Sequence, residues 1–152
     1  MAEYYNISVE EMDKFLIPQG FQKIQLPGTV ELVYGKRVDI NGIPLTMRIY
    51  TGIDPNGLSR NVGEDAMRVN LFTKINTGEI KKILGSKRVH RVKGWAKNLQ
   101  ARINDMIIAA QSIKICQKCG LPMVLREGQS KGRPYKFYGC SGWPACTFTI
   151  SQ

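Results

Sequence analysis

The sequence predicts an α+β protein in which a helix, an antiparallel β meander and a second helix are followed by a small β module. Two observations predict this fold class. Several short β-rich runs separated by turn residues lie between two segments with helical apolar spacing. In addition, all four cysteines of the 152-residue chain lie in its last third. We therefore expect one domain over residues 1–111 and a second over residues 112–152.

The first helix is predicted to begin after Ser8, because Ser8 and Glu11 form the pattern of a capping box. Apolar residues at helical spacing follow and give the helix one apolar face. Pro18 and Gly20 then end it, since neither residue continues a helix well.

Strand-like runs make up the meander, which we expect to hold three or four antiparallel strands. They cover residues 21–26, 30–40, 43–53 and 66–73. Asn41-Gly42 joins the second run to the third and is the strongest short signal for a β-hairpin. Residues 54–63 are rich in turn formers and are predicted to be a loop.

The second helix is predicted over residues 95–111. Its apolar residues recur at spacings of three and four and form a stripe that should pack on the sheet: Trp95, Leu99, Ile103, Met106 and Ala110. The linker at 111–114 is short, so we expect the second module to lie close to this helix.

The cysteines predict a metal site in the second module. Cys116-x2-Cys119 and Cys140-x5-Cys146 are two close pairs about twenty residues apart, the arrangement that holds a tetrahedral zinc ion. Disulfides are the alternative. The N-terminal residues lack the pattern of a secretory signal, so we expect a cytoplasmic protein, and a reducing cytoplasm favours thiolate and zinc.

The residues around the cysteines support a more specific comparison. The sequence Cys116-Gln-Lys-Cys119-Gly is followed by Met-Val and Arg126, and then by Phe-Tyr-Gly-Cys140-Ser-Gly-Trp-Pro-Ala-Cys146. Over residues 114–150 this pattern resembles the C-terminal zinc fingers of bacterial type IA DNA topoisomerases, although Trp143 stands where that family usually has tyrosine. The resemblance implies a zinc-ribbon-like module with the four cysteines as zinc ligands, and binding of single-stranded DNA.

Charge and aromatic content predict where nucleic acid binds. The net charge is +10, which favours polyanionic partners, and residues 81–102 hold eight basic residues and no acidic one. In the second module, basic residues alternate with aromatic rings on which bases can stack. The predicted contacts are Lys81, Lys82, Lys87, Arg88, Arg91, Lys93, Lys97, Arg126, Lys131, Arg133, Lys136, Tyr138 and Trp143. Arg37, Arg48, Arg60 and Arg68 can extend this surface.

Strand alternation leaves one choice open in the second module. Tyr135 and Phe137 should point to one side of their strand, while Lys136 and Tyr138 point to the other. One set is expected in the module's core and the other on its surface.

For nucleic-acid binding, the sequence favours DNA and leaves RNA open. Two other functions remain as alternatives. A metal-dependent nuclease would need clustered carboxylates, for which the candidates are Glu31, Asp39, Asp54, Glu64 and Asp65. A protein-interaction adaptor would use the positive charge on an acidic partner. The lone His90 lies in a basic run and is a weak candidate for a general base, so we expect binding rather than catalysis. No apolar run is long enough to span a membrane.

Overall fold

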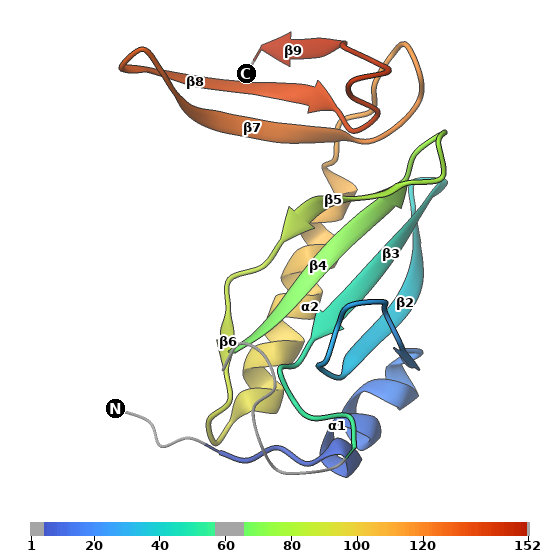
Figure 1. The fold of residues 1–152 in the computed structure, drawn as a ribbon, viewed down its shortest axis with the longest axis vertical. Helices are drawn as coiled ribbons and strands as arrows, with labels where there is room; N and C mark the ends of the chain where they lie inside the picture. Colours follow the sequence, from blue (N-terminus) through green and yellow to red (C-terminus); the bar gives the residue numbers. More distant parts are fainter. Residues whose placement is uncertain (1–4, 57–65, 152) are drawn as a thin grey trace.

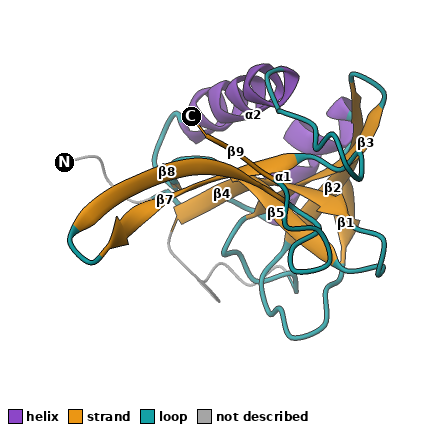
Figure 2. Cartoon of the chain, turned by 90° about the horizontal axis from the view of Figure 1, so that it is seen from above, coloured by secondary structure: helices purple, strands orange, loops and turns teal. Residues whose placement is uncertain are grey.

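The computed structural model describes residues 5–56 and 66–151, which form two antiparallel sheets and two α-helices (Figure 1). A six-stranded sheet, called the main sheet, carries both helices on one of its faces (Figure 2). A three-stranded sheet at one end of the molecule carries the cysteines; residues 113–152 are called the finger. Within the described residues, no helix has the length and apolar character needed to cross a bilayer.

The first helix, α1 (Val9–Leu16), begins as its sequence predicts. The Ser8 side chain accepts a hydrogen bond from the Glu11 N–H, and the Glu11 side chain accepts one from the Ser8 N–H. This reciprocal pair satisfies two N–H groups that have no partner within the helix. After α1 a short 3-10 helix, η1 (Ile17–Gln19), ends at Gly20, whose φ of 95° suits a residue without Cβ.

The main sheet follows the order of the chain across its first five strands. Their order is β1-β2-β3-β4-β5, with bounds β1 Gln22–Ile24, β2 Val33–Ile40, β3 Ile43–Tyr50, β4 Ala66–Lys74 and β5 Ile80–Gly85. The sixth strand, β6 (Val89–His90), pairs with the start of β4, whereas β5 pairs with its end. The β5 and β6 strands therefore share one edge of the sheet. The turn between β2 and β3 is Asn41-Gly42, and both residues have positive φ, as a tight hairpin requires.

The core lies between the main sheet and the two helices. The long helix α2 (Trp95–Gln111) buries the apolar stripe that its sequence predicts. The Trp95 ring meets the ring of Phe15 on α1 edge to face, with centroids 5.4 Å apart. Beneath the helices, alternate residues of β2, β3 and β4 are fully buried, among them Tyr34, Met47, Ile49, Val69 and Leu71. The helices thus cover one face of the sheet and leave the other face without a helical layer.

The finger is built on a hairpin of β7 (Met123–Ser130) and β8 (Arg133–Cys140), with β9 (Thr149–Ser151) added beside β8. It contacts the rest of the chain at several points. Val124 and Ile113 pack against the main core, and the Lys81 Nζ donates a hydrogen bond to the Trp143 carbonyl. These contacts hold the finger against the main core and β5.

The basic segment after residue 80 differs most from its sequence pattern. The spacing of Val89 and Val92 is not that of a strand, yet the segment forms two strands, β5 and β6, separated by a link at residues 86–88. The link is fixed by Ser86, whose N–H donates to the Val69 carbonyl and whose hydroxyl accepts from the Val69 N–H. The alternation is lost because the edge is interrupted, and Val92 already lies in the turn before α2.

Candidate metal centre and nucleic-acid interface

The four cysteines converge at one point of the finger. Their sulfur atoms all lie within 4.8 Å of one another; the Cys116 and Cys146 sulfurs are 3.6 Å apart and those of Cys119 and Cys140 are 3.1 Å apart. A tetrahedral zinc ion with Zn–S bonds of about 2.3 Å has sulfur atoms separated by about 3.8 Å, so this donor set fits zinc. Among the described residues, these cysteines are the one group of three or more ligand side chains close enough to share an ion.

The local backbone prepares these thiols for a cation. Burial by itself raises the pKa of the Cys116 thiol, but the N–H groups of Cys119 and Lys118 donate hydrogen bonds to its sulfur and bring the pKa down to about 7. Burial and the neighbouring Cys119 thiol raise the pKa of Cys140 instead. Four sulfurs this close together, two of them on buried cysteines, can ionise together only when a positive charge lies between them, which Zn²⁺ supplies.

Backbone turns hold both cysteine pairs. The Gly120 N–H donates to the Cys116 carbonyl, and the Cys116 N–H donates to the Leu121 carbonyl. The φ of 75° at Gly120 places this turn in the left-handed region, where glycine is favoured. The second pair is fixed by the Gly142 N–H, which donates to the Cys140 sulfur. A four-cysteine site on a three-stranded antiparallel sheet defines the finger as a zinc-ribbon module.

The comparisons with known proteins specify this module further. Residues 113–152 match the family described as the topoisomerase DNA-binding C4 zinc finger. The finger is therefore a topoisomerase-type C4 zinc finger, with Cys116, Cys119, Cys140 and Cys146 as its zinc ligands. A finger of this type indicates nucleic-acid binding. No curated protein and no solved structure was found to match the chain.

The register of the hairpin decides which aromatic set is available. Tyr138 packs with the buried residues of the zinc site, and the Lys114 Nζ lies 5.2 Å from the centre of its ring. Tyr138 is therefore half-buried against the finger's own core, and its contact with nucleic acid stays a prediction. Tyr135 and Phe137 lie on the opposite face, with ring centroids 5.9 Å apart. We call this opposite face of the hairpin the aromatic face.

Two glycines keep the aromatic face flat. A Cβ on Gly128 would come within 2.8 Å of the Tyr135 hydroxyl, so the tyrosine ring lies across the neighbouring strand. A Cβ on Gly139 would come within 2.9 Å of the Arg126 Nε, so this guanidinium also lies along the sheet. A positive charge and two rings are thereby spread over one surface, which suits a single strand with its phosphates and exposed bases.

Trp143 extends the aromatic face at its zinc end. Trp143 is 57% exposed, so its ring is accessible to a ligand. It borders a pocket of about 340 Å³ together with Arg126, Phe137 and Phe148. The structure thus brings two of the predicted contacts, Arg126 and Trp143, to this one pocket.

The other predicted basic residues of the finger lie further out on the hairpin. Lys131 stands at its turn with a φ of 52°, and Arg133 follows at the start of β8. Both are exposed. Lys136 is on the face that carries Tyr138, and its Nζ lies 4.0 Å from the Glu127 carboxylate across the hairpin. Lys131 and Arg133 add charge at the tip of the hairpin, Lys136 lies on the face opposite to the aromatic face, and none of the three lines the Trp143 pocket.

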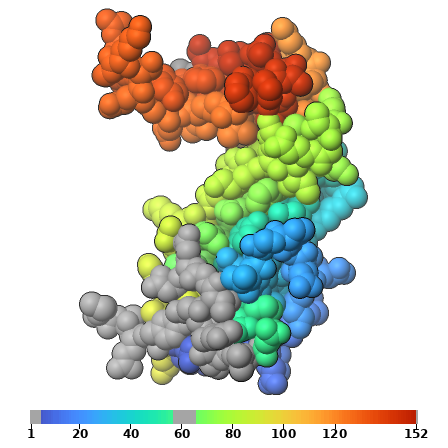
Figure 3. All heavy atoms as spheres, viewed as in Figure 1, coloured from blue at the N-terminus to red at the C-terminus, as the bar shows by residue number. Residues whose placement is uncertain are grey.

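In the basic segment, most predicted contacts are accessible and one is not. Lys82, Lys87, Arg88, Lys93 and Lys97 are exposed, and Lys81 is half-buried beside the finger. Figure 3 shows a hollow between the finger's hairpin and the edge formed by β5 and the 86–88 link. Lys87 and Arg88 lie in this link.

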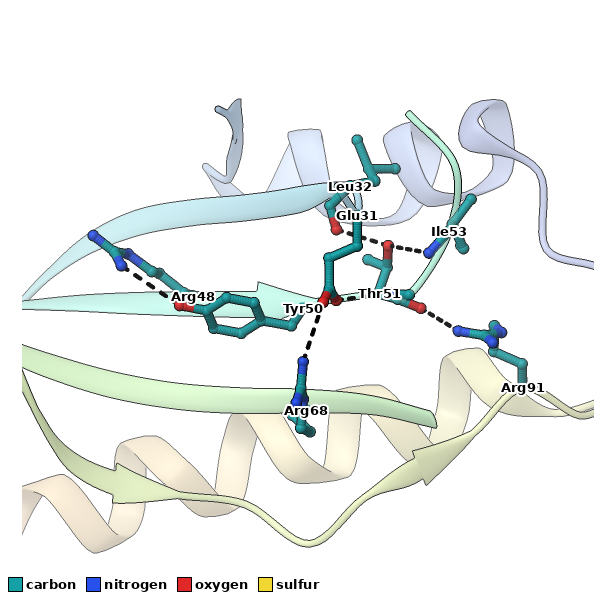
Figure 4. A network of polar contacts seen from close by, with 9 residues as sticks. Glu31, Leu32, Arg48, Tyr50, Thr51, Ile53, Arg68 and Arg91 are labelled. Atoms are coloured by element: carbon teal, nitrogen blue, oxygen red, sulfur yellow. Dashed lines mark hydrogen bonds and ion pairs between the residues drawn. The ribbon is translucent and has the colours of Figure 1, made fainter. Parts of the chain in front are cut away.

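Arg91 corrects the sequence prediction. It is 1% exposed and its guanidinium donates a hydrogen bond to the buried Thr51 carbonyl (Figure 4). The Thr51 hydroxyl in turn donates to the Leu32 carbonyl and accepts from the Ile53 N–H. Arg91 therefore holds the chain after β3 in place and does not reach a phosphate on the surface. Basic composition could not reveal this, because the partner of Arg91 lies forty residues earlier in the chain.

The carboxylates considered for catalysis are engaged in structural contacts. Glu31 accepts from the Gly52 N–H at 2.9 Å and forms an ion pair with Arg68 at 3.3 Å. The Asp39 carboxylate lies 3.4 Å from the Arg37 Nε on the same strand, and buried Asp54 accepts from the Asn56 N–H. Glu64 and Asp65, like Arg60, lie outside the described residues. His90 is exposed on β6.

Proposed function

We propose that the protein binds single-stranded nucleic acid, with DNA favoured, through the aromatic face of its zinc finger. The observation that carries this proposal is the grouping of Arg126, Phe137 and the 57% exposed Trp143 around one pocket. Aromatic rings stack on bases of any sequence, and the arginine donates hydrogen bonds to the phosphate. The process served is DNA replication, recombination, repair or the function of a mobile element.

The charge of the whole chain supports a polyanionic partner. The net charge is +10, and Lys87 and Arg88 are exposed in the link between β5 and β6. Each phosphate that these side chains neutralise releases counterions, so the affinity should fall steeply as salt rises. A protein adaptor that binds an acidic partner would share this salt dependence, so the two functions are separated by direct titration with nucleic acid.

The test is a fluorescence-anisotropy titration of the zinc-loaded full chain with single-stranded DNA, duplex DNA and RNA of one sequence. Stacking contributes about 1–3 kcal/mol per base, so Trp143→Ala should weaken single-strand binding by about 5- to 150-fold. The matched control is Ile108→Ala, which removes an exposed apolar side chain on α2. This control should bind like the wild type.

The possible results separate the candidate functions. Loss of affinity in Trp143→Ala alone supports binding by the finger, and the ranking of the three probes identifies the nucleic acid. Equal affinities for Trp143→Ala and Ile108→Ala would exclude the Trp143 pocket as the binding site. If the wild type binds none of the probes, the proposal fails and an acidic protein partner becomes the better hypothesis.

A further inference from the structure

The main sheet has a face that the helices do not cover, and this face repeats the chemistry of the finger. We call it the open face. Strand register places its residues in rows across β2, β3, β4 and β5. One row is Arg37, Thr46, Phe72 and Lys82, and the next is Gly35, Arg48, Asn70 and Gly85. A third row contains Tyr50 and Arg68. Positive charges thus alternate with rings on two neighbouring strands.

The arginines and rings of the open face are in direct contact. The Arg48 Cζ lies 4.7 Å from the centre of the Phe72 ring, and the Arg68 Cζ lies 5.2 Å from that of Tyr50. Figure 4 shows Arg48, Tyr50 and Arg68 extending from β3 and β4. An arginine held against a ring has less freedom to lose when it binds a phosphate. The contact therefore prepares the guanidinium for an anion.

Among the three arginines of the open face, Arg48 has the weakest internal compensation. Its one hydrogen bond within the described part of the chain joins its Nη1 to the Tyr50 hydroxyl, at 3.5 Å, and its shielded Nε has no acceptor. No described carboxylate forms an ion pair with it, whereas Arg68 is paired with Glu31 and Arg37 with Asp39. The terminal N–H groups of Arg48 that this one hydrogen bond does not use are donors that an incoming phosphate can satisfy.

The surface around Arg48 has room for a ligand. A groove of about 650 Å³ runs beside β2, lined by Gly35, Arg37, Thr46 and Arg48 and closed on the β1 side by Ile24. Gly35 has no Cβ, and one added there would come within 2.9 Å of the Ile24 Cδ1. The Ile24 side chain thus covers Gly35, which is buried, and the accessible part of the groove is the part lined by Arg37, Thr46 and Arg48.

The open face also adjoins the finger. Lys81 on β5 donates a hydrogen bond to the Trp143 carbonyl. The next residue, Lys82, is exposed and lies opposite Phe72 in the first row of the open face. Consecutive side chains of a strand point to opposite faces, so Lys81 reaches the finger from one side of β5 and Lys82 lies on the other, in the open face. The β5 strand therefore connects the finger to the open face.

We propose that the open face is a second binding site for single-stranded nucleic acid and that it binds the same strand as the finger. Arg37, Arg48 and Lys82 contact phosphates, and Phe72 offers its ring to a base. Charge complementarity favours a polyanionic strand, because the cations of the face outnumber its carboxylates. The four cations are Arg37, Arg48, Arg68 and Lys82, and the two carboxylates are those of Glu31 and Asp39. The inference rests on the proposed function of the finger. It adds a second site that lengthens the bound strand and raises the affinity through linkage of two sites.

The test uses the full zinc-loaded chain and fluorescein-labelled oligo-dT of about 6 and about 20 nucleotides, chosen to fit one site or both. The variant is Arg37→Gln/Arg48→Gln, and the control is Arg102→Gln on α2, on the other side of the sheet. We expect the double variant to bind the longer oligonucleotide at least about tenfold more weakly. Loss of two phosphate contacts should also reduce the slope of log K against log salt by about 1.4. The control should match the wild type.

The outcomes separate this inference from the proposed function. If Trp143→Ala weakens binding but the double variant behaves like Arg102→Gln, the finger binds alone and the inference is overturned. If the wild type binds no oligonucleotide, the proposed function itself fails. A second measurement does not depend on the folding of a variant: ultraviolet crosslinking of the wild type to bromodeoxyuridine-containing strands, followed by peptide mapping. Crosslinks to β3 and β4 support the inference, and their restriction to the finger overturns it.

Discussion

Replacement of Arg91 with methionine tests whether this arginine supports the fold or binds nucleic acid. The nearby basic residues Arg88 and Lys93 are exposed, whereas Arg91 is 1% exposed and donates to the Thr51 carbonyl. Methionine has a similar unbranched shape, so it fills much of the space while it removes the charge and the hydrogen bonds. We expect Arg91→Met to destabilise the fold.

The magnitude follows from the contact that is lost. A hydrogen bond from a charged donor contributes about 1.5–3 kcal/mol, and the Thr51 carbonyl is left buried without this donor. The free energy of unfolding should therefore fall by about 2–3 kcal/mol. With a urea m value of about 2–3 kcal/mol/M, the unfolding midpoint should move down by about 1 M.

The assay is urea denaturation followed by circular dichroism, with Lys87→Met as the matched control. Lys87 is exposed in the 86–88 link, so its replacement should change stability by less than about 0.5 kcal/mol. In binding experiments the pattern should reverse: Lys87→Met lowers the salt dependence, and folded Arg91→Met retains it. If Arg91→Met unfolds at the wild-type midpoint and loses salt dependence, Arg91 reaches phosphate and the structural role is refuted.

Two further predictions concern the zinc site and the first helix. Cys140→Ser should reduce bound zinc from one equivalent to near zero by atomic emission and unfold the finger, because one of four ligands is lost. If residues 1–111 fold independently, the amide signals of the main sheet persist in this variant, and their loss would show that the two units fold together. Ser8→Ala should cost about 1 kcal/mol in urea denaturation, because the hydroxyl caps α1 by accepting from the Glu11 N–H. An unchanged midpoint would show that the cap contributes nothing.

Much of the local structure could be read from short patterns. The capping box at Ser8 and Glu11 fixed the start of α1, and the Asn41-Gly42 pair fixed the first hairpin. Helix α2 has the predicted bounds because its stripe and its boundaries lie within one segment. The zinc ligands were predictable for the same reason, since each cysteine pair is held by a single turn.

The nucleic-acid surface was predicted less well, because it depends on neighbours that are distant in sequence. The density of basic residues predicted a nucleic-acid surface that includes Arg91. It could not show that the Arg91 guanidinium donates to the carbonyl of Thr51, forty residues earlier in the chain. Alternation separated Tyr135 from Tyr138 and could not show which of them faces the zinc site. Arg48 was expected to extend the nucleic-acid surface, but its contact with Phe72 follows from the pairing of β3 with β4.

The sequence by itself determined the elements that rest on interactions within a few residues: the caps, the tight turn, the apolar stripe and the four-cysteine cluster. The tertiary structure alone decided which face each strand residue occupies and which cations are buried. The physical reason is that strand register and sheet packing join residues tens of positions apart, as Arg37, Thr46 and Phe72 are joined in one row. Side chains in such a row act together on a ligand, although no short sequence pattern contains them.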